Sequence, residues 1–251
     1  MDTKSVNLGK AFSSGWNIFT KHAGVLIGGS LTYIAMIFML EMIFIIPMIH
    51  TTARMPQSTA PFSQMFGVQS GVFSIAIIFL LAPLFGGLSI LLLNATRDNS
   101  PSINDLFSGY RNYWKWVGLY FLISMIAFIA EFIGILGFSI MSLGIAISLV
   151  VLMTAIMVRW LFIFFAAADG AGIIESFKKS AEMTKGIRLP LFGILIVLWL
   201  FATAGVIACG IGVILTSIIA ALAITSIYVD LKSQMSGTAP SESALEPEPG
   251  Q

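Results

Sequence analysis

Four long apolar blocks make up most of this chain and constrain its fold more than any other feature. They cover residues 23–49, 68–95, 117–168 and 189–229, and the second and fourth contain no charged residue. A helix needs about 20 apolar residues to cross the hydrocarbon core of a bilayer. Only 10% of the 251 residues are charged, against about a quarter in soluble domains. The alternation of apolar and polar residues that is typical of barrel strands is missing. The sequence therefore predicts an all-α integral membrane protein.

The two longest blocks each have room for a helical hairpin, so a bundle of six transmembrane helices fits the chain. Weak glycine-containing breaks near 134–144 and 205–212 divide these two blocks. The predicted spans are residues 23–49, 68–95, 117–137, 142–165, 189–207 and 210–229. Residues 1–232 thus form a single transmembrane domain. The polar, proline-rich tail at 233–251 is predicted to be a disordered cytoplasmic segment.

The basic residues fall almost entirely on one side of this threading. Twelve of the 13 Lys and Arg residues lie at the inner end of a span or in an inner segment, and only Arg54 lies in an outer loop. By the positive-inside rule, both termini are then cytoplasmic. Residues 1–21 are too polar for a cleaved signal peptide. We therefore expect a multipass protein whose two ends face the cytoplasm.

Three amphipathic segments, residues 8–22, 103–116 and 173–186, each precede a pair of predicted spans and resemble one another. Phe107 and Phe177 each stand eight residues before a lysine. In the first two segments, the aromatic residues share one helical face. This pattern predicts three interfacial amphipathic helices, one before each hairpin, and hence a three-fold internal repeat.

Basic and aromatic residues of these segments form a candidate lipid-headgroup rim on the cytoplasmic side. Its members are Lys10, Trp16, Lys21, Arg111, Lys115, Lys178, Lys179, Lys185 and Arg188. Lys and Arg next to a bilayer attract anionic headgroups. One interpretation is a basic collar that binds lipid phosphates. The other is ordinary anchoring of the topology by aromatic and basic side chains.

Glu41, Glu131 and Arg159 are the ionisable residues well within the predicted spans, and they form a candidate intramembrane polar site. A charged side chain at mid-bilayer costs roughly 2.5–3.5 kcal/mol on insertion scales, so something should offset that cost. Both glutamates fall toward the outer leaflet, with His50 nearby, where a pair of carboxylates could bind a cation or relay protons in a transporter. The alternative is interhelical hydrogen bonding by neutral carboxyl groups.

Two further features lie toward the inner half of the predicted bundle. Arg159 is expected to extend to the inner surface and to pair with Asp98, Asp105 or Asp169. Pro83 is expected to kink the second span. Such a kink either exposes carbonyl groups to a substrate or serves helix packing alone.

Two stretches carry a family resemblance: SPSINDLFSGYRNYWKWVGLYFLI at 100–123, and VRWLFIFFAAADGAGIIESFKKSAEMTKGIRLPLFGIL at 158–195. They include Asp105-Leu106-Phe107-Ser108-Gly109, Arg159, Ser176-Phe177-Lys178-Lys179-Ser180 and Thr184-Lys185-Gly186. Over most of 1–230 the chain resembles the YciC-like bacterial six-span inner-membrane proteins, a group related to the membrane domain of some glycerophosphodiester phosphodiesterases. The resemblance implies a bacterial cytoplasmic-membrane protein without an established activity. No attached phosphodiesterase domain is expected here, so that catalytic function is not implied.

Enzymatic chemistry is not indicated by the residues. His22 and His50 lie at opposite ends of the first predicted span and cannot share a metal. Cys209 lies in an apolar block without a nearby base, and as the single cysteine it can form no intramolecular disulfide. The net charge of +1 argues against nucleic acid as a partner.

The sequence thus predicts a non-enzymatic membrane protein without cofactor or metal, which organises the membrane or belongs to a membrane complex. Its expected partners are the bilayer and anionic headgroups, and a homo-oligomer or a membrane-protein partner is compatible with the small-residue spacing in its spans. The alternative is a transporter of small solutes or lipids, or a lipid-binding protein. It would use the Glu41 and Glu131 region or the basic rim.

Overall fold

The computed structural model describes residues 6–54, 62–140, 158–205 and 211–236, and these contain helices and no strand. The elements are α1 (Leu8–Arg54), α2 (Phe62–Thr96), α3 (Asp105–Ser108), the 3-10 helix η1 (Gly109–Asn112), α4 (Tyr113–Ile140), α6 (Ile163–Ala168), α7 (Ile173–Met183), α8 (Arg188–Ala204) and α9 (Ile211–Ser236). The predicted all-α fold is confirmed for these residues.

Three helical stretches are long and apolar enough to cross a membrane: Leu8–Ile43, Phe79–Thr96 and Gly212–Ser236. A fourth is obtained if α7 and α8, which meet at a bend of 99°, count as one broken span. This agrees with the membrane character predicted from the sequence. Predicted spans one, two and three fall within α1, α2 and α4, and spans five and six match α8 and α9, except that α8 ends three residues early and α9 begins one residue late. Most of the predicted fourth span, 142–165, lies outside the described residues.

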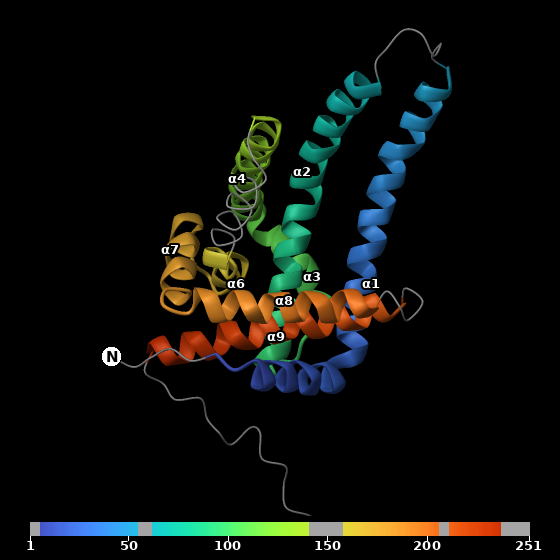
Figure 1. Cartoon of the computed structure of the whole chain (residues 1–251). Helices are drawn as coiled ribbons and strands as arrows, with labels where there is room; N and C mark the ends of the chain where they lie inside the picture. The colour runs from blue at the N-terminus through green and yellow to red at the C-terminus, as the bar shows by residue number, and fades with distance from the viewer. Residues whose placement is uncertain (1–5, 55–61, 141–157, 206–210, 237–251) are drawn as a thin grey trace, which may run out of the picture.

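The helices are arranged in two directions (Figure 1). The long hairpin of α1 and α2 rises from the lower half of the molecule, and α4 rises beside it. The pair formed by α8 and α9 runs across the lower part of this group, where α9 contacts α1, α2 and α8. The last two helices therefore do not run parallel to the first two.

α1 is kinked at His22, where the backbone leaves the helical region (φ −119°, ψ 22°). The segment before the kink, residues 8–21, lies crosswise at the bottom of the molecule (Figure 1). It runs antiparallel to α9, and Gly15 is so close that an added Cβ would lie 3.0 Å from the backbone nitrogen of Ala223. The neighbouring Trp16 is half exposed. The predicted helix therefore exists as the first part of α1, and its small-residue face at Ala11 and Gly15 packs on α9, while its interfacial position stays a prediction.

The three segments of the predicted repeat differ in structure. Residues 8–22 are continuous with α1 up to its kink, residues 103–116 divide into α3, η1 and the start of α4, and residues 173–186 form α7 and a turn. The three-fold repeat therefore stays a prediction. α4 continues through residues 134–140, the first part of the break predicted at 134–144, and residues 141–144 lie outside the described residues, so the turn there stays a prediction. Glycine is common in membrane helices, where neighbouring helices tolerate it.

α2 continues through Pro83, and its neighbours compensate for the proline. Pro83 has no N–H, so the carbonyl oxygen of Phe79 loses its helical donor. The hydroxyl of Tyr113 donates to that oxygen at 2.9 Å, and the hydroxyl of Tyr110 donates to the carbonyl of Leu80 at 2.9 Å. Because these carbonyl groups are already bonded, the structure favours the packing interpretation of Pro83 over exposure of carbonyls to a substrate.

Candidate functional site: a basic pocket between α6, α7 and α8

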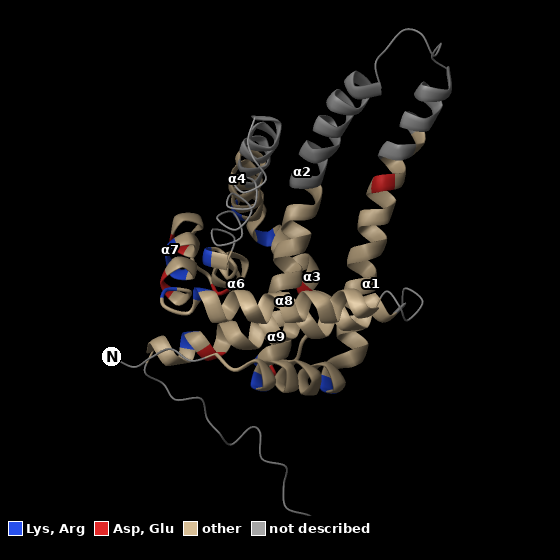
Figure 2. Ribbon diagram, viewed as in Figure 1, with Lys and Arg blue, Asp and Glu red and all other residues tan. Residues whose placement is uncertain are grey.

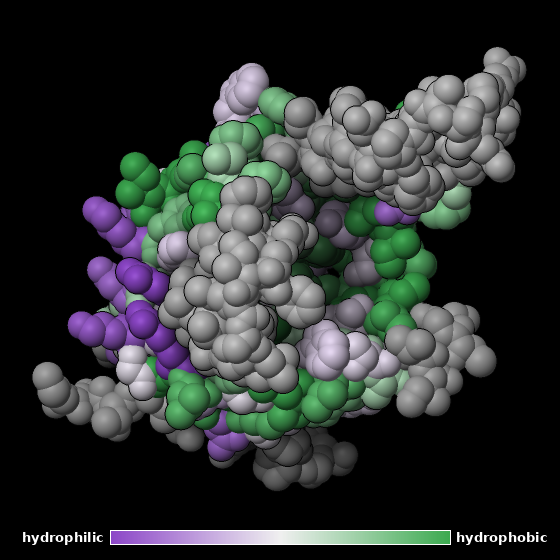
Figure 3. Space-filling model, turned by 45° about the horizontal axis from the view of Figure 1, so that its top comes forward, coloured by the Kyte–Doolittle hydropathy of each residue, from purple (hydrophilic) through white to green (hydrophobic). Residues whose placement is uncertain are grey.

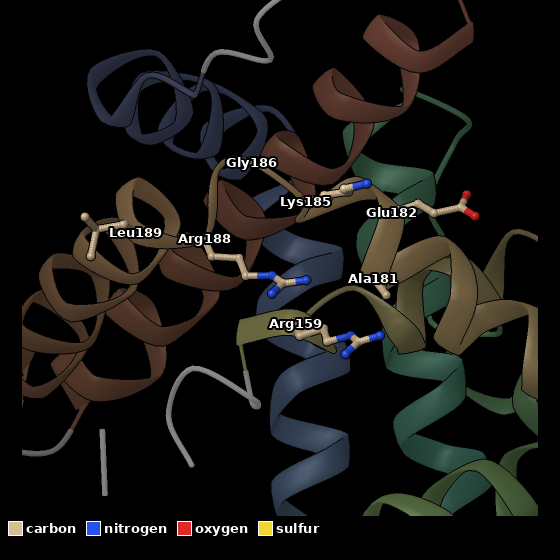
Figure 4. A pocket seen from close by; sticks show the side chains of 7 residues that line it. All are labelled: Arg159, Ala181, Glu182, Lys185, Gly186, Arg188 and Leu189. Carbon is tan, nitrogen blue, oxygen red and sulfur yellow. The ribbon is translucent and has the colours of Figure 1, made fainter. Parts of the chain in front are cut away.

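An open pocket of about 640 Å³ lies where the chain before α6 meets α7 and the start of α8. Its lining residues are Arg159, Ala181, Glu182, Lys185, Gly186, Arg188 and Leu189 (Figure 4). Three cationic side chains therefore share this pocket with a single carboxylate. Two of the three, Lys185 and Arg188, belong to the predicted headgroup rim, and Arg159 belongs to the predicted intramembrane site.

Arg159 reaches the pocket because the helix breaks just after it. Residues 160–162 form a turn, and α7 supplies the hydrogen bonds that the turn lacks. The hydroxyl of Ser180 accepts from the N–H of Phe162 at 3.1 Å and donates to the carbonyl of Arg159 at 3.0 Å. The hydroxyl of Thr184 lies 3.3 Å from the same carbonyl, and its nearer acceptor is the carbonyl of Ser180 at 3.0 Å. Both hydroxyls belong to fully buried residues. The backbone of Arg159 is thus fixed, while its side chain stays exposed.

The turn between α7 and α8 places the other two cations. Gly186 has a φ of +88°, in the left-handed region that favours glycine, and it lets the chain turn sharply into α8. Lys185 and Arg188 flank this turn. α8 begins at Arg188, and the preceding Ile187 provides no side-chain cap. The first N–H groups of a helix have no intrahelical partner and carry partial positive charge, so this helix end adds to the cationic character of the pocket.

The side chains are oriented for an anion (Figure 4). The guanidinium groups of Arg159 and Arg188 extend toward the same space, whereas the carboxylate of Glu182 is directed away from both. Leu189 stands at the edge with 81% of its surface exposed. Guanidinium groups bind phosphate and carboxylate oxygens through paired hydrogen bonds, so this arrangement can hold an anionic group beside an apolar surface.

Arg159 does not take the carboxylate partners expected for it. Asp98 lies 2.5 Å from Nζ of Lys21 and 3.0 Å from Nε2 of His22. Asp105 accepts from the amide of Asn94 at 3.0 Å. The structure thus gives these two carboxylates other partners.

The third carboxylate, Asp169, holds three elements together. Its oxygens lie 2.6 Å from Nη1 of Arg97 and 2.7 Å from both Nζ of Lys232 and the hydroxyl of Tyr228. Burial opposes its ionised form, but hydrogen bonds from Arg97, Lys232 and Tyr228 outweigh burial and lower the pKa of Asp169 to about 2. This cluster was not predicted from the sequence. The only signal was that Arg97 and Asp169 both lie in short inner connections.

The rest of the predicted rim is divided among separate contacts. Lys10 lies 3.4 Å from Asp230, Lys115 donates to the carbonyl of Ala167 at 2.6 Å, and Lys179 lies 2.7 Å from Glu175 one turn away. Lys21 pairs with Asp98 as described above. Hydrophilic residues gather on the side of the molecule where α7 lies (Figure 3). The rim is therefore not one uniform collar, and its densest cationic part is the pocket.

The two glutamates of the predicted intramembrane site, Glu41 and Glu131, are only partly described by the structure. Glu41 lies partly buried in α1. Glu131 lies in α4, but its side chain, like that of His50, is outside the described residues. Their approach to one another stays a prediction. Among the described residues, no three His, Cys, Asp or Glu side chains are grouped so that they could hold a metal ion.

Comparison with known proteins adds no further assignment, since none of the protein-family models, curated proteins or solved structures compared with the chain matches it.

Proposed function

We propose that this chain is a non-enzymatic integral membrane protein that binds the headgroups of anionic lipids in the basic pocket of its inner rim, and not along the rim as a whole. The observation that carries this proposal is the meeting of Arg159, Lys185 and Arg188 in one pocket, with the only lining carboxylate directed away from the guanidinium groups. Basic pockets on the cytoplasmic side of membrane helices are typical sites for phosphate-bearing headgroups. The exposed Leu189 at the edge suits contact with the adjoining acyl chains.

The proposed setting is a bacterial inner membrane, with six spans and both termini in the cytoplasm. Two observations support it: the one-sided distribution of Lys and Arg along the sequence, and the grouping of nearly all charged described residues in one half of the molecule (Figure 2). In this setting α8 and α9 would cross the bilayer strongly tilted relative to α1 and α2. The resemblance to the YciC-like proteins belongs to the same proposal.

Lipid binding by paired variants tests the proposed function. We expect Arg159→Gln/Arg188→Gln to lose about tenfold or more in affinity for phosphatidylglycerol, because each charge-assisted hydrogen bond contributes about 1.5–3 kcal/mol. The measurement is binding of dioctanoyl-phosphatidylglycerol to the purified full chain in a neutral detergent, followed by native mass spectrometry.

Arg111→Gln/Lys178→Gln is the matched control. It removes the same two charges from exposed positions that do not line the pocket. If both double variants lose affinity equally, binding depends on overall charge and not on the pocket, and the proposed function is wrong.

A further inference from the structure

We infer that the pocket selects lipids whose headgroup is a phosphomonoester, such as phosphatidic acid, over lipids whose headgroup is a phosphodiester. This inference rests on the proposed function and specifies its ligand. It follows from the charge of the pocket, from its hydrogen-bond donors and from the surface beside it.

The charge of the lining residues matches a dianion. Arg159, Lys185 and Arg188 against Glu182 leave a net charge of +2. A phosphomonoester carries about −1.5 to −2 at pH 7, whereas a phosphodiester carries a single negative charge. A monoester therefore neutralises the pocket, and a diester leaves excess positive charge. Because the pocket is open, solvent screens this difference but does not remove it.

The hydrogen-bond donors of the pocket also favour a phosphate with three terminal oxygens over a phosphate with two. Each guanidinium has five N–H donors in a planar fork, and those of Arg159 and Arg188 extend toward the same space. The N-terminus of α8 adds backbone donors at Arg188 and Leu189, since Ile187 gives it no side-chain cap. A monoester presents three terminal oxygens to these groups. Esterification of one of those oxygens in a diester removes an acceptor.

The surface beside the pocket indicates a lipid as the source of that phosphate. From Leu189 onward, α8 exposes Ile196, Val197, Trp199 and Leu200, each with more than 40% of its surface accessible. An acyl chain attached to the phosphate can lie against this apolar face. A soluble phosphomonoester gains nothing from it, so the lipid should bind more tightly than the free headgroup.

Binding of three probes to the full chain in neutral detergent tests the inference: dioctanoyl-phosphatidic acid, dioctanoyl-phosphatidylglycerol and glycerol 3-phosphate. We expect the phosphatidic acid to bind about tenfold more tightly than the phosphatidylglycerol. Arg159→Gln lowers the net charge to +1, so it should reduce this preference to about threefold or less. Arg111→Gln, which removes the same charge outside the pocket, should keep it.

The outcomes separate this inference from the proposed function. Equal affinities for the two lipids in the unmodified chain would overturn the selectivity and leave the proposed function standing. Failure of both lipids to bind would overturn both. Glycerol 3-phosphate binding as tightly as phosphatidic acid would overturn the lipid as the source and identify a soluble phosphomonoester instead.

Discussion

Asp169 shows how a single carboxylate can fasten distant parts of a membrane protein at its polar edge. Its side chain is only 9% exposed, and its partners come from the end of α2 (Arg97) and from α9 (Tyr228 and Lys232). A buried carboxylate without partners is costly. Removing one partner of Asp169 therefore destabilises the fold more than breaking an ion pair at the surface does. The cluster therefore contributes stability that depends on the ionised form of Asp169.

We predict that acid removes this contribution. The pKa of Asp169 is about 2 in the folded chain, against about 3.9 in an unfolded one. A lowered folded pKa stabilises the fold above the unfolded pKa, and the gain is lost as the pH falls from about 4 to about 2. The expected loss is about 2 kcal/mol in the free energy of unfolding. Thermal unfolding of the full chain in detergent, followed between pH 5 and pH 2, measures it.

Asp169→Asn provides the reference for that titration. It should lower the free energy of unfolding by about 3 kcal/mol near neutral pH, because Arg97 loses its charged partner. It should also flatten the pH dependence. An Asn variant with the same acid transition as the unmodified chain would show that other carboxyl groups are responsible.

At this scale the sequence predicts on which side of the membrane these residues lie, which stays a prediction, but it did not predict their partners. The positions of Arg159 and Asp169 along the apolar blocks predict that both lie near the inner surface, and for Arg159 this agrees with the positive-inside rule. The groups that Arg159 meets depend on the helix break at residues 160–162 and on the hydrogen bonds of this break to Ser180. Neither hydropathy nor charge spacing predicts where that break lies or which way the side chain of Arg159 then points.

Among the elements, α2 and the α3–η1 segment pack so closely that their backbones are in contact. Cβ atoms added to Gly87 or Gly109 would overlap the carbonyl groups of Leu106 and Pro83, respectively. The helix backbones can approach this closely because glycine has no side chain. The approach also brings Tyr110 and Tyr113 to the carbonyl groups near Pro83.

We therefore predict that Gly87→Ala destabilises the fold by about 1–3 kcal/mol or more, since the added methyl group must push the backbone of α3 away. Gly193→Ala in α8 is the matched control, because its Cβ would meet nothing within 4 Å. The control should be neutral or stabilising by about 0.5–1 kcal/mol, as expected for alanine in a helix. Urea or thermal unfolding of the two variants in the same detergent gives the comparison. Similar losses in both would mean that the α2–α3 contact does not limit stability.

The elements themselves were largely predictable, and their contacts were not. Apolar length located the helices that became α1, α2, α4, α8 and α9, because insertion into lipid depends on hydrophobicity and length. The division of residues 8–22 from the first span was also correct, since α1 kinks at His22. The packing of residues 8–21 on α9 was not predicted, because the small face of Ala11 and Gly15 gives no hydropathy or charge signal that identifies its partner.

For the whole molecule, the crosswise position of α8 and α9 is compatible with two membrane topologies (Figure 1). In a six-span topology, the connection between these helices lies on the extracytoplasmic side of the membrane. If the pair instead lies along the cytoplasmic face, the connection is inside, while both termini remain cytoplasmic. Hydropathy alone cannot distinguish the two, because it predicts how apolar a helix is but not its angle to the others.

Cys209, the single cysteine, lies in that connection and provides the test. We predict that a membrane-impermeant maleimide labels Cys209 in intact cells with a permeabilised outer layer and not in inverted membrane vesicles. The tail variant Cys209→Ser/Ser241→Cys should show the reverse pattern. Labelling of Cys209 only in inverted vesicles would exclude six spans, and labelling of the tail from outside would exclude cytoplasmic termini.

The antiparallel packing of residues 8–21 on α9 also has a consequence for biosynthesis. Gly15 and its neighbour Ala223 are separated by about 200 residues, so at about 5–20 residues per second the ribosome needs on the order of ten to forty seconds to supply the partner of the first segment. During that interval the nascent chain must keep its leading helix from premature association, either against the lipid surface or within the insertion machinery. Premature termination anywhere before the last helix would leave that leading helix unmatched, and such fragments would be preferred substrates for membrane proteases.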